Sequence, residues 1–549
     1  MPGIKIEDAG LWPADDVCSV VAPISLSVPA ECEPKCGIPA RRNRMSDTML
    51  TLGDALRVNA LKWPDRPCLA DPNRRLTFSE VNSRVNRLAH GLLALGCAPT
   101  DAIAIYARNS IEYLEMFHAC AKLGLRFVTL NFWHRLSEME VLFNHSEASW
   151  LVVDEADQDR IAELRLRLPK LRGLIVVGTA DIEGAYSWTD ILACGHEGEP
   201  SVAVDKNAPF WMMYTSGTTG SPKGLYRSFL RTSLCLWAGM IEFGYRRNDS
   251  FLAVSPFFHG VTFLPLMVLQ TGGSVYVLSE FVPEQVISVI EQESISCSFM
   301  VPTTLSMLMS HARYKTADFS SLRMLVTGGS ALPTLVKTNI MHKMGPVLHE
   351  FYGASESGFI TVLHPDDQLG KERCCGQPAF GAEVEIRGEN GRPVRPGEVG
   401  EVFTRCEGRF DAYFKDAKRT DAAVQQGWFT AGDLGRMDEQ GFVYIVDRKS
   451  DLIISGGENI YPREIEDVLR NHPAIADCAV IGVADELWGE AVKAVVVAQA
   501  GSSLSPHDVI AHCSAHLAGF KRPKHVEFAS ALPKNASGKV LKAQLRSQS

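Results

Sequence analysis

The chain has 549 residues, more than one hydrophobic core can hold, so two or more domains are expected. Hydrophobic residues make up 46% and charged residues 22%, proportions typical of a globular protein in water. The formal net charge of −9, without a dominant basic patch, argues against nucleic acid as the main partner. Because no apolar run of about eighteen residues occurs, no transmembrane segment is predicted.

Residues 1–45 are predicted to form a mobile N-terminal extension. They contain six prolines, six acidic and five basic residues without a helical or strand period. Acidic residues precede the apolar stretch 17–30, where a secretory signal would carry positive charge. The fourteen cysteines lack zinc-type or disulfide spacing, so reduced thiols and a cytoplasmic location are expected. A natural start at Met45, after a translated upstream stretch, and a regulatory tail both stay open.

From residue 46 onward, helical patterns alternate with short apolar runs. The first two helices are expected over 52–63 and over 78–95, the second with Thr77 as its N-cap. Apolar runs that fit buried strands lie at 102–106, 151–153, 251–255, 274–278, 298–301 and 324–327. Strands that alternate with helices predict an α/β fold with parallel sheets.

After residue 376 the pattern changes to short strands, expected at 384–386, 400–405 and 441–446 and separated by Gly/Pro turns. This pattern indicates a β-rich subdomain over 376–447. From residue 448, a small α+β domain is indicated by strands at 479–482 and 494–499 and helices at 462–471 and 506–517. The predicted architecture is therefore a large domain over 46–447 and a C-terminal domain over 448–549.

The stretch 214–224 reads Tyr-Thr-Ser-Gly-Thr-Thr-Gly-Ser-Pro-Lys-Gly and carries the strongest functional signal. Gly217, Gly220 and Gly224 are expected to let the backbone approach a ligand and adopt positive φ. Backbone N–H groups and hydroxyls supply donors for an oligophosphate, and Lys223 supplies a positive charge. A Walker loop is excluded because a proline precedes the lysine and a glycine follows it. An apolar run just before the loop anchors it, which favours a nucleotide-phosphate site over a flexible surface loop.

The loop resembles the signature of the adenylate-forming superfamily, which comprises acyl-CoA synthetases, peptide-synthetase adenylation domains and luciferases. Five further motifs follow in the family's order, at 352–356, 427–433, 447–451, 456–459 and 533–539. The likeness covers the chain from about residue 46 to its end. It implies a large N-terminal domain that adenylates a carboxylic acid with ATP and Mg²⁺, and a small, mobile C-terminal domain.

The resemblance implies roles for individual residues of the nucleotide site. Lys223 is expected at the β- and γ-phosphates and Glu356 on Mg²⁺. Tyr352 is expected to stack on adenine, and Asp433 to accept both ribose hydroxyls. Lys539 is expected to bridge the carboxylate and the α-phosphate during adenylation. The other expected ATP or AMP contacts are Thr215, Ser216, Gly217, Thr218, Thr219, Gly220, Gly329, Ser330, Ala331, Gly353, Ser355 and Arg448. Outside these motifs, each charged residue would more simply be a solvated surface group.

The resemblance also implies sites for CoA and for the acid. CoA is expected at a channel lined by Gly456, Gly457 and Glu458, and Ser450 is expected to be the hinge of the C-terminal domain. His259 is expected to act between the acyl pocket and this channel, although a lone histidine is more often structural. The acid pocket is expected to be formed by His259, Val261, Phe263, Val301 and Gly328. These side chains are mostly apolar or small, so a hydrophobic acyl or aryl acid is predicted.

Together these features predict an AMP-forming carboxylate–CoA ligase, with ATP, CoA and a small carboxylic acid as its partners. The acid and ATP give an acyl-adenylate and pyrophosphate, and the CoA thiol then displaces AMP. The chain ends at Ser549 without a carrier domain, which favours free CoA as the acceptor. The alternatives are an enzyme that loads a separate carrier protein, a luciferase-like oxygenase and a nucleotide-sensing scaffold. A homodimer also stays open.

Overall fold

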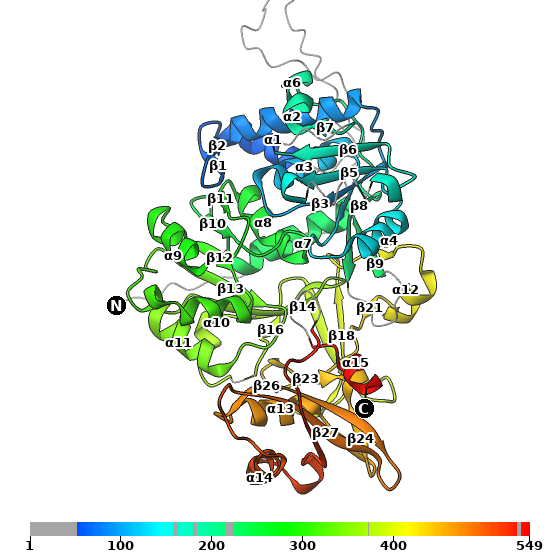
Figure 1. Cartoon of the computed structure of the whole chain (residues 1–549). Coiled ribbons are helices and arrows are strands. Elements are labelled where there is room, and N and C mark those ends of the chain that lie inside the picture. The colour runs from blue at the N-terminus through cyan, green and yellow to red at the C-terminus, as the bar shows by residue number, and fades with distance from the viewer. Residues whose placement is uncertain are drawn as a thin grey trace, which may run out of the picture. The chain divides into compact units, whose positions relative to one another are not determined.

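The predicted alternation of helices and strands builds two sheets whose central strands run parallel (Figure 1). The computed structural model describes residues 52–548 except 158–162, 164, 179–183, 216–222, 372 and 535–539. The strand predicted at 102–106 is β3 (Ala102–Tyr106), and that predicted at 151–153 lies within β5 (Trp150–Asp154). Parallel strands that are covered on both faces are buried along their whole length. Their sequences are therefore unbroken runs of apolar residues.

In the described residues the first sheet has eight strands, in the order β19-β9-β8-β4-β3-β5-β6-β7. The strands from β8 to β7 in this order run parallel, whereas β9 and β19 add antiparallel at one edge. The strands not yet given are β4 (Arg126–Thr129), β6 (Gly173–Val177), β7 (Tyr186–Ser187), β8 (Pro209–Thr215), β9 (Lys223–Ser228) and β19 (Ala412–Tyr413). This edge brings a segment near residue 412 beside the strand that begins at Lys223.

The second sheet has nine strands in the described residues, in the order β16-β15-β14-β13-β12-β10-β11-β1-β2. Its parallel centre runs from β14 to β1, and antiparallel strands close both edges. The strands are β1 (Pro67–Ala70), β2 (Arg75–Thr77), β10 (Ser250–Ala253), β11 (Ser274–Val277), β12 (Cys297–Phe299), β13 (Met324–Gly328), β14 (Leu348–Ala354), β15 (Gly358–Leu363) and β16 (Gln377–Pro378). The four strands predicted between residues 251 and 327 are thus confirmed as β10 to β13.

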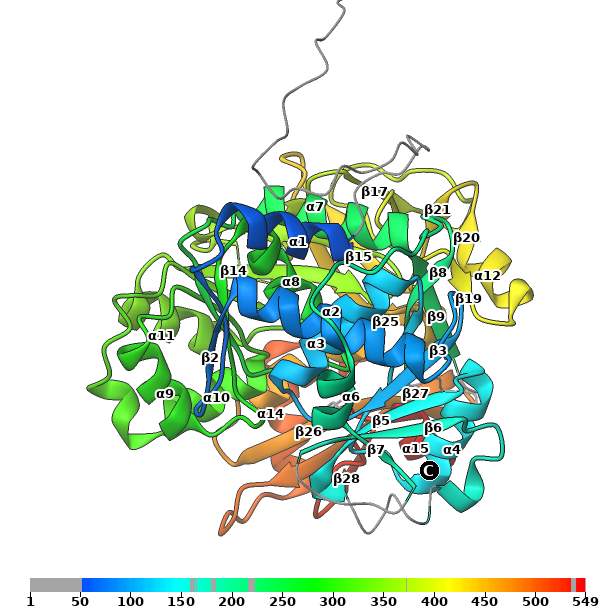
Figure 2. The same cartoon turned by 90° about the horizontal axis from the view of Figure 1, so that it is seen from above.

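Helices link and cover the two sheets. α7 (Phe229–Phe243) packs on β8 and β9, α8 (Phe263–Thr271) packs on β10 and β11, and the two helices contact each other. The predicted N-terminal helices are found as α1 (Leu52–Lys62) and α2 (Phe78–Ala94), which lie side by side with α3 (Ile111–Leu123) (Figure 2). The others are α4 (Leu136–Ser146), α6 (Trp188–Cys194), α9 (Pro283–Gln292), α10 (Pro302–Ser310) and α11 (Thr334–Met344). None of the helices in the described ranges is long and apolar enough to cross a membrane.

A smaller sheet follows, as the Gly/Pro-rich pattern predicts, and all its strand pairs in the described residues are antiparallel. Within the described residues its strand order is β20-β21-β18-β22-β23, with β17 paired to β18. The elements are β17 (Ala382–Arg387), β18 (Gly400–Cys406), α12 (Ala417–Ala423), β20 (Val424–Gln425), β21 (Trp428–Phe429), β22 (Asp433–Met437) and β23 (Val443–Arg448). The start of β22 and the end of β23 lie side by side, so that Asp433 pairs with Arg448.

The C-terminal elements, orange and red in Figure 1, form a sheet with its own apolar core. They are β24 (Ile453–Ser455), β25 (Glu458–Ile460), α13 (Pro462–Arg470), β26 (Ile475–Asp485), β27 (Gly489–Ala498), α14 (Pro506–His516), β28 (His525–Phe528) and α15 (Lys542–Ser547). Both predicted strands and both predicted helices of this segment are present. The domain boundary between residues 447 and 448 stays a prediction.

Candidate active site

The predicted phosphate loop lies at the tip of a β-hairpin. β8 and β9 pair antiparallel, with Thr215 opposite Lys223. The loop residues between them, with the side chain of Thr215, fall outside the described residues. The expectation of a positive φ at Gly224 is wrong, because its φ is not positive. A Cβ on Gly224 would lie 2.6 Å from Met212 Cε and 3.0 Å from the Tyr214 ring, so tight packing is what favours glycine there.

Lys223 and Glu356 meet at one point, although they come from different sheets. The ammonium Nζ of Lys223 lies 2.7 Å from Glu356 Oε1. The hydroxyl of Tyr413 donates to the same oxygen, also at 2.7 Å. Burial alone would raise the pKa of Glu356, but the Lys223 charge and the two hydrogen bonds outweigh it and lower that pKa. Glu356 is therefore an ionised, buried carboxylate.

A single carboxylate of this kind suits Mg²⁺. Both of these contacts of the Glu356 side chain fall on Oε1, and the carboxylate also accepts a hydrogen bond from its own backbone N–H. In the described part of the chain, no three His, Cys, Asp or Glu side chains gather into a protein-made metal site. Mg²⁺ needs no such cage, because it is usually held by one or two carboxylates together with phosphate oxygens and water. The residues fit a metal ion that arrives with a nucleotide.

Tyr352, Asp433 and Arg448 come together where β22 begins. Asp433 lies opposite Arg448 across β22 and β23, and the two side chains form an ion pair with Arg448 Nε 3.1 Å from Asp433 Oδ1. The hydroxyl of Tyr352, from β14, donates to Oδ2 at 2.6 Å. Each carboxylate oxygen can accept more than one hydrogen bond. Both oxygens of Asp433 can therefore still accept from two neighbouring hydroxyls such as those of a ribose.

The segment with the expected nucleotide contacts Gly329, Ser330 and Ala331 leaves the sheet next to β14, the strand that carries Tyr352. Gly328 ends β13 and lies opposite Phe351 of β14. A Cβ on Gly328 would come within 2.7 Å of the Phe351 carbonyl oxygen, so the close approach of the two strands requires glycine. The exposed residues 329–331 follow directly. They lie at the carboxyl ends of parallel strands, where open α/β sheets bind ligands.

Gly353 lies in β14 just before the tight turn that presents Glu356, and Ser355 is the first residue of that turn. A Cβ on Gly353 would lie 2.0 Å from the Gly358 carbonyl oxygen, so a side chain there would force β14 and β15 apart. Ser355 is half-buried in the turn itself. The two residues are thus placed next to the proposed metal ligand.

His259 lies just before a short 3-10 turn, η2 (Gly260–Thr262), and is half-buried. Burial, reinforced by the nearby His134, lowers the pKa of His259 to about 4. Its ring lies 4.2 Å from that of Phe258, measured between centroids. The imidazole is therefore neutral at pH 7, which suits a residue that positions a ligand by shape and hydrogen bonding.

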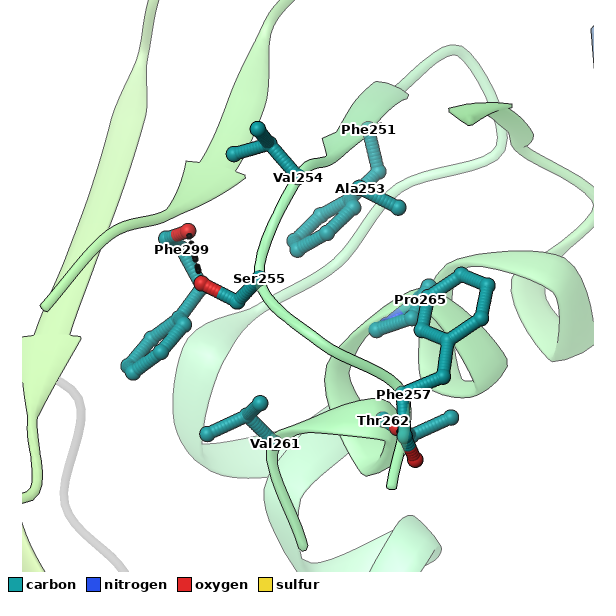
Figure 3. A pocket seen from close by; sticks show the side chains of 9 residues that line it. All are labelled: Phe251, Ala253, Val254, Ser255, Phe257, Val261, Thr262, Pro265 and Phe299. Atoms are coloured by element: carbon teal, nitrogen blue, oxygen red, sulfur yellow. Dashed lines mark hydrogen bonds between the residues drawn. The ribbon is translucent and has the colours of Figure 1, made fainter. Parts of the chain in front are cut away.

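A small apolar cavity follows in the same segment. Figure 3 shows its walls, which are Phe251, Ala253, Val254, Ser255, Phe257, Val261, Thr262, Pro265 and Phe299. Of the residues predicted for the acid site, Val261 lines this cavity. Phe263 packs instead against Trp211, with ring centroids 4.5 Å apart, and Val301 precedes α10. The structure thus places Val261 at the cavity, His259 just before the turn that carries Val261, and Phe263 in the core.

Comparison with known proteins decides the family. A family model described as AMP-binding enzyme matches residues 56–414, and a model of the AMP-binding enzyme C-terminal domain matches residues 464–539. The chain belongs to the AMP-binding enzyme family. The resemblance to the adenylate-forming superfamily, within it the acyl-CoA synthetases, is thereby confirmed.

The relatives of this AMP-binding enzyme match it over nearly their whole length. It is 34% identical over 497 residues to a feruloyl-CoA synthase from Amycolatopsis sp, covering 88% of this chain and 98% of that one. It is 34% identical over 509 residues to a long-chain-fatty-acid–CoA ligase from Mycobacterium tuberculosis, covering 91% and 99%. A solved amide bond synthetase from Marinactinospora thermotolerans shares 29% identity at a TM-score of 0.82, covering 90% and 99%. The predicted fold class is therefore confirmed.

In the C-terminal part of this AMP-binding enzyme, the residues predicted for CoA lie at a hairpin tip. Gly456 and Gly457 form the turn between β24 and β25, with φ of 61° and 85°. Two central residues at positive φ are typical of a two-residue turn that matches strand twist, and glycine adopts them without strain. A Cβ on Gly456 would lie 2.5 Å from the Trp488 ring, whereas Glu458 is exposed.

Ser450, the predicted hinge, is exposed in the 3-10 turn η5 (Lys449–Asp451). Arg448 before it is held by Asp433, and Asp451 after it pairs with Arg546 at 2.8 Å. The turn thus connects two anchored residues. The predicted catalytic Lys539 lies outside the described residues.

Of the residues that lie at these sites, sequence reasoning missed Tyr413 and all the lining residues of the apolar cavity except Val261, including Phe299. Tyr413 touches both Lys223 and Glu356, and Phe299 lines the apolar cavity. Neither belongs to a motif with an evident chemical pattern. Only the pairing of β19 with β9 and the course of β12 bring them there.

Proposed function

We propose that this chain is an AMP-forming carboxylate–CoA ligase. A carboxylate oxygen attacks the α-phosphorus of ATP, the bond between the α-phosphorus and the bridging oxygen breaks, and pyrophosphate leaves. The CoA thiol then loses its proton to water, its sulfur attacks the acyl carbon, and AMP leaves with the electrons of the broken mixed-anhydride C–O bond. The observation that carries the proposal is the contact of Lys223 with Glu356, which follows β14, the strand that carries Tyr352 of the Tyr352–Asp433–Arg448 cluster.

The residues divide the first step between them. Asp433 accepts the ribose hydroxyls, and Tyr352 with the 329–331 segment holds the adenine. Lys223 moves from Glu356 to the β- and γ-phosphates, where its charge offsets theirs. Glu356 holds Mg²⁺, which supplies charge neutralisation to the phosphates when it is bound. Lys539 supports the negative charge that grows between the carboxylate and the α-phosphate.

The acid is proposed to be a hydrophobic acyl or aryl acid. The cavity beside η2 is lined by aromatic and aliphatic side chains, with the hydroxyls of Ser255 and Thr262 bonded to backbone carbonyls. An apolar acid gains free energy when such side chains cover it, whereas a second charge would lose its water without a partner. The relatives named for feruloyl and long-chain fatty acids support this class.

The second step is proposed to use the hairpin at Gly456 and Gly457 together with His259. We place the hairpin along the thiol arm of CoA, and Ser450 at the hinge that brings it there after adenylation. The neutral ring of His259 separates the acyl pocket from this channel. The cysteines of the described residues are free thiols, which agrees with the proposed cytoplasmic location.

The test is a screen of aryl and medium- to long-chain acids with ATP, Mg²⁺ and CoA. At least one acid should give AMP and its CoA thioester in equal amounts, detected by mass spectrometry. Glu356→Gln serves as the control variant and should lose this activity. If an acid is instead transferred only to a carrier protein, or only to an amine, the CoA ligase proposal is wrong. Size-exclusion chromatography of the same preparation decides between a monomer and a homodimer.

A further inference from the structure

Tyr413 is fixed to the strand that carries Lys223. It belongs to β19, which pairs antiparallel with β9 so that Tyr413 lies opposite Leu225. On its C-terminal side, the N–H of Phe414 donates to the Gly224 carbonyl at 2.7 Å. The ring is buried, with 5% of the residue exposed. Tyr413 therefore cannot move without disturbing the hairpin of the phosphate loop.

Tyr413, Lys223 and Glu356 contact one another in all three pairs. The Tyr413 hydroxyl and the Lys223 ammonium both lie 2.7 Å from Glu356 Oε1. The same ammonium lies 4.7 Å from the centroid of the Tyr413 ring, within the range of a cation–π contact. The segment before Tyr413 also binds the backbone of Glu356, because the N–H of Phe410 donates to its carbonyl at 2.6 Å.

The hydroxyl and the ring of Tyr413 suit different partners, the hydroxyl the Glu356 carboxylate and the ring the Lys223 ammonium. The Tyr413 hydroxyl donates its hydrogen bond to Glu356 Oε1. A donor fixed on Oε1 sets the rotation of the carboxylate that is proposed to hold the metal ion. The face of the Tyr413 ring is a second partner for the Lys223 ammonium. This contact can persist when the ammonium leaves Glu356 for a phosphate.

We propose that Tyr413 is a positioning residue of the nucleotide site, orienting Glu356 through its hydroxyl and Lys223 through its ring. This inference rests on the proposed function, because it assigns Glu356 to Mg²⁺ and Lys223 to the phosphates of ATP. The two tasks are separable. Loss of the hydroxyl affects the metal-dependent part of nucleotide binding, and loss of the ring also affects the part that depends on Lys223.

The test measures ATP binding by calorimetry, once with Mg²⁺ and once with EDTA, for the full chain and two variants. Tyr413→Phe keeps the ring, so its affinity for Mg-ATP should fall about tenfold, the size of one lost hydrogen bond to a charged group. Its affinity for metal-free ATP should stay within about twofold. Tyr413→Leu should weaken the binding of both Mg-ATP and metal-free ATP. For metal-free ATP, the affinity should fall by about three- to tenfold. Tyr226→Phe, on the neighbouring strand, is the matched control and should change neither.

If Tyr413 has a purely structural role, Tyr413→Phe should lower the affinities for Mg-ATP and for metal-free ATP equally. That result would overturn the inference. Unchanged affinities in Tyr413→Phe would overturn it as well. If Tyr413→Leu does not fold, as judged by circular dichroism, Tyr413→Phe alone decides. Wild-type enzyme that binds Mg-ATP but yields no CoA thioester contradicts the ligase proposal instead, so the two failures are distinguishable.

Discussion

Replacement of Asp433 by asparagine tests the ribose site at a single carboxylate. The Asp433 side chain is 8% exposed and lies between the Tyr352 hydroxyl and Arg448 Nε. Asparagine keeps the shape but removes the charge, and its amide nitrogen offers a donor where the ribose also offers one. Arg448 is 46% exposed, so the loss of this ion pair should cost the fold no more than about 1 kcal/mol. The effect on nucleotide binding should therefore exceed the effect on stability.

The expected magnitude follows from the two hydrogen bonds that ribose would make. A hydrogen bond to a charged group contributes about 1.5–3 kcal/mol, so two contribute about 3–6 kcal/mol when both are lost. The asparagine oxygen retains part of one bond. We therefore expect the lower end, about 3 kcal/mol, which corresponds to a Kd for ATP raised by about 100-fold.

The decisive assay combines the variant with a changed ligand. In the wild type, 2′-deoxy-ATP should bind about tenfold more weakly than ATP, because one hydroxyl is missing. In Asp433→Asn this ratio should shrink to about threefold or less, since the missing hydroxyl no longer has a charged acceptor. Asp438→Asn, at the turn after β22, should leave both affinities unchanged. If the ratio is the same in wild type and Asp433→Asn, Asp433 does not bind the ribose.

Three further predictions concern other residues. Lys539→Ala should slow adenylation by about 10²–10³, as for a lost transition-state donor, while thioester formation from synthetic acyl-adenylate survives; equal losses would contradict its role. Ser450→Pro should leave adenylation near the wild-type rate but sharply slow thioester formation, because proline fixes φ at the hinge; two unchanged half-reactions would refute the assignment. Glu350 is buried beside Lys337, and burial raises its pKa to about 7 from 4.5. The folded state therefore holds this proton more tightly than the unfolded state. Urea unfolding should show that wild type loses stability relative to Glu350→Gln as pH rises from 5 to 8, by up to about 3 kcal/mol, and a gap independent of pH would contradict this.

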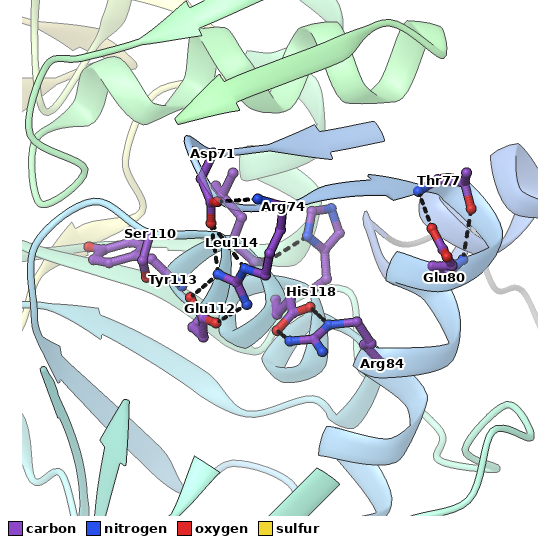
Figure 4. Close-up of polar contacts among 11 residues, drawn as sticks. Asp71, Arg74, Thr77, Glu80, Arg84, Ser110, Glu112, Tyr113, Leu114 and His118 are labelled. Atoms are coloured by element: carbon purple, nitrogen blue, oxygen red, sulfur yellow. Dashed lines mark hydrogen bonds and ion pairs between the residues drawn. The ribbon is translucent and has the colours of Figure 1, made fainter. Parts of the chain in front are cut away.

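Local elements followed from local patterns. The helix predicted after Thr77 is found as α2, and Figure 4 shows its capping box, in which the Glu80 N–H donates to Thr77 Oγ1 and the Thr77 N–H donates to the Glu80 carboxylate. β3 matches its predicted range because an unbroken apolar run is what a fully covered strand requires. These signals depend on neighbours in the sequence, so no knowledge of the tertiary structure is needed to read them.

In α3 the local sequence pattern does not predict the burial of the helix. It is buried along its whole length although it carries Glu112, Glu115 and His118. Figure 4 shows how the fold accommodates them, with Arg74 donating to Glu112 at 2.7 Å and Arg84 to Glu115 at 2.5 Å. Charged residues in a helix ordinarily indicate a solvent face. His118 bonds to the Leu114 carbonyl of its own helix, whereas the partners of Glu112 and Glu115 come from other segments and are not visible in the sequence of the helix.

The order of the motifs in the chain by itself determined the family, the nucleotide chemistry and most of the residues proposed for it. The tertiary structure decided how they meet. Lys223 reaches Glu356 because β8 and β9 form a hairpin, Tyr413 joins them because β19 adds to that edge, and Asp433 meets Arg448 through the register of β22 and β23. Strand order and register are set by the packing of whole sheets, so the contacts they create between distant residues cannot be read from local sequence.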